Sequence, residues 1–399
     1  MKTQSKNLLF ITTSSLASNP RLVKEFETLK NDFICFVLCF RHHDWSLELS
    51  EAIKKRNPEV HFIEIDRRVE VFKTLVSKLV HKVSIVLNGL FKKNIQVCAF
   101  ASNDKTPQLW FHAKSLVEQN KFHRVIAHNL GAFYPALKVT NMTETALQLD
   151  IEDFYPGEAL YFNKAQEQQN RMHLMLHSFL NADVITYASK GIQLECEKYF
   201  QIAGQTETSV ILNAFNSKDF KKPISRFSDK ITCVWFSQHI GPNRGLETVF
   251  EIAEQLPQIE FHIIGNNNVS FLNKMRISEN VLIHDVMAPF KLHAFLAKMD
   301  IGLALEPGKD LNNKIALSNK LIAYAQAGCY VIATDTYGQS QFLSSLDYPA
   351  GVVMQTSLEE TLRNLEIRLL DIPSKIERWE NAKSFSWDNE QLKLKGLFS

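Results

Sequence analysis

Short apolar runs alternate with stretches of helical periodicity along most of the chain. The run FICFVLCF at 33–40 does not alternate with polar residues, which is typical of parallel strands buried on both faces. Strands that alternate with helices predict parallel sheets covered by helices, so we expect an α/β fold. Strands are predicted at 7–13, 33–40, 60–65, 124–129, 146–151, 183–188, 231–238, 259–265, 281–286, 301–306, 329–334 and 351–355.

Helices are predicted between these strands. The first helix runs from Pro20 to about Lys30, because Pro20 suits the first helical position and Asn19 suits the N-cap. A long polar helix is expected at 156–180. In the second half, helical periodicity covers 245–256, 290–299 and 316–328.

The chain divides into two predicted domains, 1–212 and 231–375, because the polar stretch at 213–230 is typical of a linker. Glycine is distributed unevenly between them. The first glycine is Gly89, which excludes a GxGxxG or Walker loop after the first strand, and with it a dehydrogenase or kinase nucleotide site there. Eight of the 14 glycines lie within 241–351, mostly where strands turn into helices. We therefore expect a phosphate-bearing ligand on the second domain.

The composition is that of an ordinary globular protein, with 45% hydrophobic and 22% charged residues. Lys plus Arg number 45 and Asp plus Glu 43, so no bulk charge calls for nucleic acid. The six cysteines form no CxxC pair and lie mostly in apolar runs, which favours buried thiols over disulfides or metal ligands. The apolar core LLFI near the start is too short for a signal peptide, and no apolar stretch approaches the ~18 residues that span a membrane. We expect a cytoplasmic protein.

Two segments of the second domain suit an anionic ligand. After the strand at 231–238, a loop with Gly241 leads to Arg244 at the start of a helix, where free N–H groups and a guanidinium favour a diphosphate. Later, Ser318 can cap a helix whose first turn presents Asn319 and Lys320. Alone, each segment could be a plain turn or helix start with a solvated cation. Together, at the ends of strands of one sheet, they favour a binding site.

The same two segments resemble, in order and spacing, the donor domain of family 4 glycosyltransferases of the GT-B fold. The later segment, SNKLIAYAQAGCYVIATD, is similar to the family's NKLFEYMAAGKPVIAS. Further segments that resemble family motifs are SNPRLVKEFETL, HNLGAFYPALKV, VILNAF and, near the end, FSWDNEQLKL. The resemblance extends over nearly the whole chain.

This resemblance implies two Rossmann-like, doubly wound parallel-sheet domains that face a central cleft. It implies that a UDP- or GDP-sugar donor binds to domain 231–375 and that a saccharide or lipid-linked acceptor binds to domain 1–212. The C-terminal helix 376–399 is expected to pack with domain 1–212. It also implies retaining transfer in cell-surface polysaccharide synthesis, without a metal or other cofactor. Catalytic roles then fall on Glu306, Lys320 and Arg244. Donor-binding roles fall on Gly241, Arg244, Gly265, Asn266, Val286, Asn319 and Lys320, and acceptor-side roles on Asn19, Arg21, His128, Asp150, Glu152 and Asp153.

Several positions depart from the family pattern. His239 stands near the family's usual Arg, and Ala323 stands where its second donor Glu is expected. The first donor Glu has two candidates, Glu306 and Asp310. Ala323 keeps open a non-catalytic GT-B subunit that binds a partner enzyme. A nucleotide-sugar epimerase of the same fold is the alternative among enzymes.

Asp150, Glu152 and Asp153 also resemble the DxD metal site of GT-A glycosyltransferases, because two carboxylates one residue apart can hold a divalent ion. The predicted phosphate loops lie in the other domain, so an acceptor-side or helix-capping role is favoured. The histidines include His42 and His43 but no zinc-ligand spacing, so zinc is not expected.

The segment 67–93 suggests a membrane surface. It holds seven Lys or Arg residues and one acid, Glu70. Its apolar residues recur with helical spacing from Phe72 to Phe91, with lysines around them. One interpretation places this stripe on the anionic inner face of a membrane. The other packs the stripe on the first domain and leaves the lysines solvated.

Overall fold

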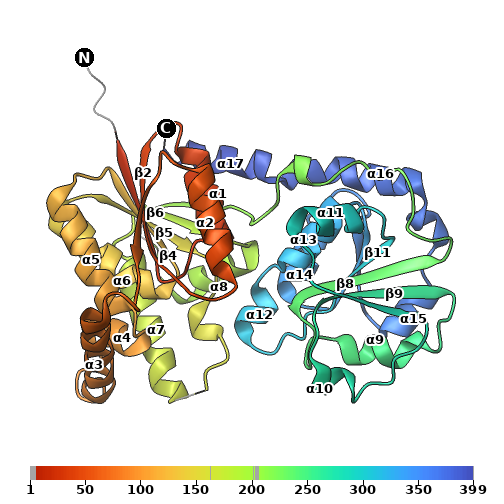
Figure 1. Ribbon diagram of the computed structural model, residues 1–399, viewed down its shortest axis with the longest axis horizontal. Helices are drawn as coiled ribbons and strands as arrows, with labels where there is room; N and C mark the ends of the chain where they lie inside the picture. Colours follow the sequence, from red (N-terminus) through yellow and green to blue (C-terminus); the bar gives the residue numbers. More distant parts are fainter. Residues whose placement is uncertain (1–5, 162, 201, 203–205, 399) are drawn as a thin grey trace. The chain divides into compact units, whose positions relative to one another are not determined.

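The computed structural model describes all residues except 1–5, 162, 201, 203–205 and 399 (Figure 1). By their internal contacts, the residues form two compact units. The first unit contains Met1–Ala188, Ile192–Ile211 and Lys393–Ser399, and the second contains Ser189–Gly191 and Leu212–Leu392. The stretch 213–230 therefore lies in the second unit.

The first unit is built on a seven-stranded sheet in the order β3-β2-β1-β4-β5-β6-β7, with every neighbouring pair parallel. The first six of these strands were predicted. The seventh was not, because its sequence ETSV is short and half polar. The strands are β1 Asn7–Thr12, β2 Ile34–Phe40, β3 His61–Ile65, β4 Arg124–His128, β5 Ala146–Ile151, β6 Val184–Tyr187 and β7 Glu207–Val210.

Helices cover both faces of this sheet, with α1 Pro20–Leu29 and α2 Ser46–Arg56 on one face and α5 Thr106–Gln119 and α6 Leu130–Thr143 on the other (Figure 1). The N-cap prediction is confirmed, because the Asn19 side chain accepts from the Leu22 N–H at 3.1 Å. The other helices are α3 Val71–Leu87, α4 Ile95–Ser102, η1 Tyr155–Gly157, α7 Lys164–Phe179 and α8 Lys190–Tyr199.

The predicted helix at 156–180 is wrong in its first third. The 3₁₀ turn η1 ends at Gly157, and α7 begins only at Lys164, after Asn163 in a left-handed conformation with φ 39°. The Pro156-Gly157 pair ends one turn, and a left-handed residue interrupts the backbone hydrogen-bond ladder before the next helix.

The second unit is built on a six-stranded parallel sheet in the order β10-β9-β8-β11-β12-β13, and all six strands were predicted. They are β8 Ile231–His239, β9 Ile259–Asn266, β10 Val281–His284, β11 Ile301–Ala304, β12 Tyr330–Ala333 and β13 Gly351–Val353. The helical elements of this part of the chain are η2 Ser217–Asp219, α9 Leu246–Ala253, α10 Val269–Leu272, α11 Pro289–Leu296, α12 Leu311–Ile315, α13 Asn319–Gln326, α14 Tyr337–Ser344, α15 Leu358–Arg363, η3 Ile367–Leu370, α16 Ile372–Asn381, η4 Ala382–Phe385 and α17 Trp387–Gly396.

Two hydrophobic cores lie on opposite faces of the second sheet. One joins the strands to α9 and α15, and the other joins them to α11, α13 and α14 (Figure 1). Each sheet is thus doubly wound, and its strand order reverses at one point, between β1 and β4 in the first unit and between β8 and β11 in the second. Ligands of such sheets bind beyond the carboxyl ends of the strands at these reversal points.

All six cysteines are buried thiols without disulfide partners, as their apolar surroundings predict. Among the described helices, none combines the length and apolar character needed to cross a bilayer.

Candidate functional site

The loops after β8 and β9 line an open pocket of about 590 Å³ in the second unit. Three of the predicted donor-side residues line it: Gly241, Arg244 and Asn266. The other lining residues are His239, Ile240, Pro242, Asn267, Asn268 and Val269. The cavity lies where the Gly-containing loops lead into α9 and α10, which is the position that the sequence predicts for an anionic ligand.

Arg244 is positioned by an unusual backbone turn. Asn243 and Gly245 on either side of it have φ of 58° and 77°. A Cβ on Gly245 would lie 2.6 Å from the Cβ of Leu305, so only glycine allows this loop to approach the end of β11. The Arg244 guanidinium is held by one hydrogen bond, from Nη1 to Ser237 Oγ at 2.9 Å, and its side chain remains exposed.

Glu306 and Lys320 meet at the end of β11. The Lys320 ammonium donates to Glu306 Oε1, and the Ser318 hydroxyl donates to the same oxygen at 2.9 Å. Ser318 is the N-cap of α13 and accepts the Lys320 N–H at 3.3 Å, as predicted from the sequence. The cap therefore fixes both the start of the helix and the position of the catalytic candidate Glu306.

The electrostatics of this group leave an excess of positive charge. Burial alone would raise the pKa of Glu306, but the Lys320 ammonium, the Ser318 hydroxyl and the charge of Arg244 together hold that pKa below its usual range. Glu306 is therefore ionised at neutral pH and compensates one of two cations. The other cation and the N-terminus of α13 remain available to a ligand with two negative charges.

The remaining donor-side candidates are more dispersed. Gly265 lets β8 and β9 approach, because a Cβ there would lie 2.6 Å from the Ser237 carbonyl oxygen. Asn319 is exposed in the first turn of α13. Val286 follows β10, is exposed, and does not line the cavity. Ala323 is buried in the core under α13, so this position offers no carboxylate to a ligand.

In the first unit, three of the predicted acceptor-side residues form one buried ionic network. Arg21 of α1 donates from Nε and Nη2 to the two oxygens of Asp150, at 2.5 and 2.6 Å, and from Nη1 to the Ile211 carbonyl. His128, at the end of β4, has Nδ1 3.1 Å from Asp150 Oδ2. All three side chains are almost completely buried.

Two residues that the sequence did not single out complete this network. Glu25 lies 3.2 Å from His128 Nε2, and Thr186 of β6 donates to Asp150 at 2.6 Å. Glu25 stands four residues after Arg21 on the same helical face, and this spacing was the available signal. Glu152 joins at the partly exposed edge, with Oε1 3.2 Å from His128 Nδ1.

The charges of this network stabilise one another. Burial would lower the pKa of His128, but Glu25, Asp150 and Glu152 hold that pKa well above its usual range. Burial would likewise raise the pKa of Asp150, but Arg21 and His128 hold it well below its usual range. The pKa of Glu25 is raised by burial and by Asp150.

Glu25, His128 and Asp150 could in principle share a metal ion, because one ligand atom of each lies within 4.8 Å of the others. However, the Arg21 guanidinium already binds both Asp150 oxygens, and a protonated imidazole offers no lone pair to a metal. The donor set therefore fits a closed ionic network better than a metal centre. Of the other candidates, Asn19 is the cap of α1, and Asp153 lies partly exposed after β5.

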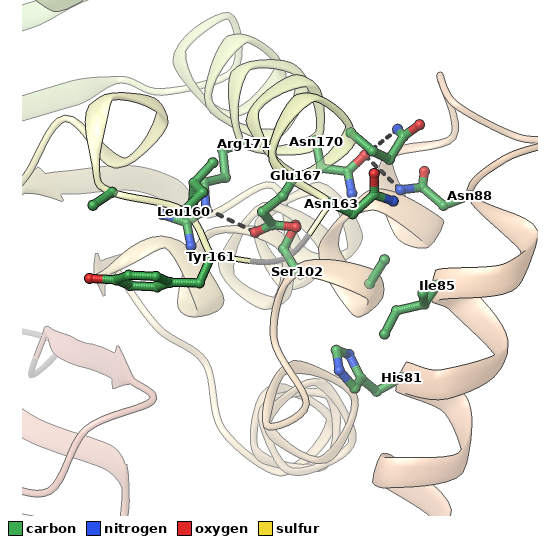
Figure 2. Close-up of a pocket in the computed structure, with 13 residues that line it drawn as sticks. His81, Ile85, Asn88, Ser102, Leu160, Tyr161, Asn163, Glu167, Asn170 and Arg171 are labelled. Atoms are coloured by element: carbon green, nitrogen blue, oxygen red, sulfur yellow. Dashed lines mark hydrogen bonds and ion pairs between the residues drawn. The ribbon is translucent and has the colours of Figure 1, made fainter. Parts of the chain in front are cut away.

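Two neighbouring cavities lie in the first unit. The smaller, of about 170 Å³, lies at the reversal point of the sheet, where Thr13 and Asn129 follow β1 and β4. The larger, of about 460 Å³, lies among α3, α4, α7 and the segment before α7 (Figure 2). Ser102 and Arg171 line both cavities, so the two are neighbours.

The larger cavity is lined by amides, hydroxyl groups, an imidazole, apolar side chains and one ion pair. Asn88, just after α3, donates to Asn170 of α7 at 2.8 Å, and Arg171 is paired with Glu167 at 2.8 Å (Figure 2). The exposed Tyr161 ring lies near Leu160 (Figure 2). Amide groups and a charged pair can bind the hydroxyl groups of a polyhydroxylated ligand such as a sugar, and the aromatic ring can pack on its apolar face.

No protein-family model matches the sequence, and no curated protein matches it. Solved structures do match over the whole chain. HepE of Anabaena, in complex with UDP and glucose, is 11% identical over 98% of this chain and 99% of its own, with a TM-score of 0.66. Sucrose-phosphate synthase from Thermosynechococcus elongatus is 12% identical over 98% of each chain, with a TM-score of 0.67. A UDP-N-acetylglucosamine 2-epimerase is 11% identical over 99% and 95%, with a TM-score of 0.56.

The similarity to these solved structures establishes the fold of the chain. The two parallel-sheet α/β units match structures of the GT-B glycosyltransferase type, which confirms the predicted fold class. Membership of family 4 in particular stays an expectation from the sequence motifs.

Proposed function

We propose that this protein is a glycosyltransferase that moves a sugar from a nucleotide-sugar donor to a saccharide or lipid-linked acceptor. One observation carries the proposal: Lys320 and the start of α13 meet Glu306 at the end of β11, and the charge of Arg244 acts on the same carboxylate. A UDP-sugar is favoured over a GDP-sugar, because HepE and TarM, which share the fold, have been crystallised with UDP.

The donor-side residues would act on the leaving group. Transfer of the sugar leaves a nucleoside diphosphate, whose negative charge grows as the glycosidic bond breaks. Arg244, Lys320 and the N–H groups at the start of α13 would stabilise that charge before the reaction begins, so little reorganisation is needed. Glu306 would hold Lys320 in place. We expect no requirement for a metal ion, and retention of configuration, as the family resemblance implies.

The first unit would bind the acceptor. Its two neighbouring cavities offer amide and hydroxyl groups suited to a sugar, and the smaller lies at the reversal point of the sheet. The buried network of Arg21, His128 and Asp150 would position Glu152 at that edge. The six unpaired cysteines support a reducing compartment, the cytoplasm, and a role in polysaccharide synthesis at the cell surface follows from the family resemblance.

The proposal is tested by nucleotide binding and turnover. We expect UDP-sugar hydrolysis or transfer with the purified protein, and UDP binding by calorimetry. Arg244→Ala and Lys320→Ala should each weaken UDP binding by about 1.5–3 kcal/mol, because each removes a hydrogen bond between charged groups. Turnover should survive EDTA.

Arg276→Ala is the matched control, since Arg276 is an exposed arginine of the same unit paired only with Glu254 among the contacts of the structure. Unchanged UDP affinity in both Arg244→Ala and Lys320→Ala would remove the donor site. Conversion of a UDP-sugar to its epimer without an acceptor would instead establish an epimerase, and binding without any turnover would establish a non-catalytic subunit. Loss of activity with EDTA, restored by Mn²⁺, would move the chemistry to the acidic residues 150–153.

A further inference from the structure

Helix α3 is amphipathic, but it buries its polar side and exposes its apolar side, the opposite of an ordinary surface helix. Its buried side chains are the polar Thr74, Ser77 and Ser84. Its apolar side chains are exposed, and they form one face of the helix: Phe72, Leu75, Val76, Leu79, Val83 and Val86. The interpretation that packs this stripe on the first unit is therefore wrong.

The polar side of α3 holds the helix in this orientation. Ser77 Oγ donates to the Asp104 carbonyl at 2.7 Å, and His81 Nδ1 lies 2.7 Å from the Phe100 carbonyl oxygen. Asn88, just after the helix, bonds to Asn170 (Figure 2). These contacts recur at helical intervals along one side of α3. The opposite, apolar side is therefore held facing outward and cannot turn inward.

The exposed apolar surface continues beyond the helix. Leu90 and Phe91 follow it in the next turn, and Phe111 of α5 is exposed beside Lys73. Phe72 and Leu90, at the two ends, are 78% and 80% exposed. We call this set, α3 with Leu90, Phe91 and Phe111, the α3 surface. An exposed apolar face of this extent marks an interaction site.

Four exposed lysines border the α3 surface: Lys78, Lys82, Lys92 and Lys93. None of the four is ion-paired within the described residues, whereas Lys73 is paired with Glu70 and Arg67 with Asp104. The surface therefore combines apolar side chains at its centre with uncompensated positive charge at its border.

We propose that the α3 surface binds an anionic lipid bilayer, with α3 lying in the plane of the membrane–water interface. A helix in that position buries its apolar side chains among the acyl chains, while lysines at its border reach the lipid phosphates. A protein partner would need acidic groups placed opposite each lysine, whereas an anionic bilayer supplies them at any orientation.

His81 and Ile85 of the same helix, and Asn88 just after it, line the 460 Å³ cavity. The polar cavity therefore lies one helix diameter, about 10 Å, from the proposed membrane surface. Resting on the proposed function, this arrangement suits an acceptor with a sugar in the cavity and a lipid in the bilayer.

The test is vesicle sedimentation with the full chain and no sugar donor. We expect binding to phosphatidylcholine vesicles that contain phosphatidylglycerol, little binding to pure phosphatidylcholine, and weakening as salt rises, since charge attraction is screened over about 10 Å at 0.1 M. Replacing Lys78, Lys82, Lys92 and Lys93 with Glu should reduce the affinity by about a thousandfold. The matched control replaces four exposed lysines of the second unit, Lys221, Lys222, Lys274 and Lys291, with Glu and should still bind.

A second variant, Leu75→Ser/Leu79→Ser/Val86→Ser, tests the apolar part. Because these side chains are exposed, the variant should keep its circular dichroism and melting temperature while losing vesicle binding. Persistent binding in either α3 variant would overturn the proposal. So would a wild-type dimer that the triple-serine variant converts to a monomer, because the α3 surface would then be a protein interface. None of these readouts uses the donor site, so their failure leaves the proposed transferase activity standing.

Discussion

His128 is the residue on which the buried network of the first unit depends. Its imidazole lies between Glu25 on one side and Asp150 and Glu152 on the other. Arg21 alone cannot neutralise three carboxylates. Removing the histidine would therefore leave buried negative charges facing one another.

We predict that His128→Ala lowers the free energy of unfolding by about 3–5 kcal/mol at pH 6, the cost of breaking a buried ion pair. The folded-state pKa of His128 is raised above its unfolded value, so its contribution is fully present below about pH 6.5 and is lost as pH rises through the raised pKa. The wild type should lose stability toward alkaline pH, and the variant should lack most of that loss. Urea unfolding from pH 6 to 10 measures both.

His61→Ala is the control, since His61 is exposed at the edge of the sheet and should leave the pH profile unchanged. A parallel decline of His128→Ala and wild type at high pH would contradict the assignment.

Among single residues, the sequence motifs identified the charged residues of the buried network more completely than the partners of these residues. The motif resemblance selected Arg21, His128 and Asp150, which do meet. It missed Glu25, because a pair of opposite charges four residues apart on a helix is usually on the surface, and only the packing of α1 over β4 and β5 buries this one. The family resemblance also implied a donor-binding role for Val286, which follows β10, is exposed and does not line the pocket.

The contact of α13 with β11 illustrates how elements of the second unit fit. Gly302 of β11 faces Tyr324 of α13 so closely that a Cβ would lie 2.2 Å from Tyr324 Cγ. The Tyr324 hydroxyl in turn accepts the Phe236 N–H at 3.2 Å. Because residue 302 has no side chain, α13 can pack closely on β11. This packing distance positions Lys320 in the first turn of α13.

We predict that Gly302→Ala destabilises the protein by about 1–3 kcal/mol, the usual cost of overpacking a filled core, and weakens UDP binding as α13 shifts. Equilibrium unfolding in urea and calorimetry measure the two effects. Gly89→Ala, where the nearest atom to an added Cβ is 3.7 Å away, should change neither. Equal stability of Gly302→Ala and wild type would show that α13 can move freely.

Most elements of the fold were predictable because their sequences are unambiguous. Strands such as β2 and β12 are continuous apolar runs, which are typical of a sheet covered on both faces. The inward face of α3 was not predictable. Helical periodicity shows that a helix has two different faces, but it does not show which one the rest of the chain contacts.

At the scale of the whole molecule, the chain returns to the first unit at Lys393–Ser399 after forming the second. Leu394 in this segment is completely buried, and Arg124 of β4 donates to the Leu397 carbonyl at 2.9 Å while lying 4.1 Å from the Phe398 ring centre. The first unit is therefore completed by residues far along the chain.

We predict that Leu394→Ala costs about 2–5 kcal/mol, because it leaves a cavity in the first unit. Hydrogen exchange should increase in β1, β2 and β4 and stay unchanged in β8 and β11. Leu392→Ala, two residues earlier and 62% exposed, should change stability by no more than about 0.5 kcal/mol. Faster exchange throughout both units would contradict an effect confined to the first.

This returning segment also has a consequence for synthesis in the cell. Ribosomes add about 5–20 residues per second, so residues 393–398 emerge roughly 10–40 s after residue 211. Throughout that interval the first unit lacks its last segment, while the apolar side chains of α3 are already exposed. We therefore expect the nascent chain to bind chaperones that recognise exposed apolar segments, and slowing translation within 212–392 should lower the yield of folded protein more than slowing it within 1–211.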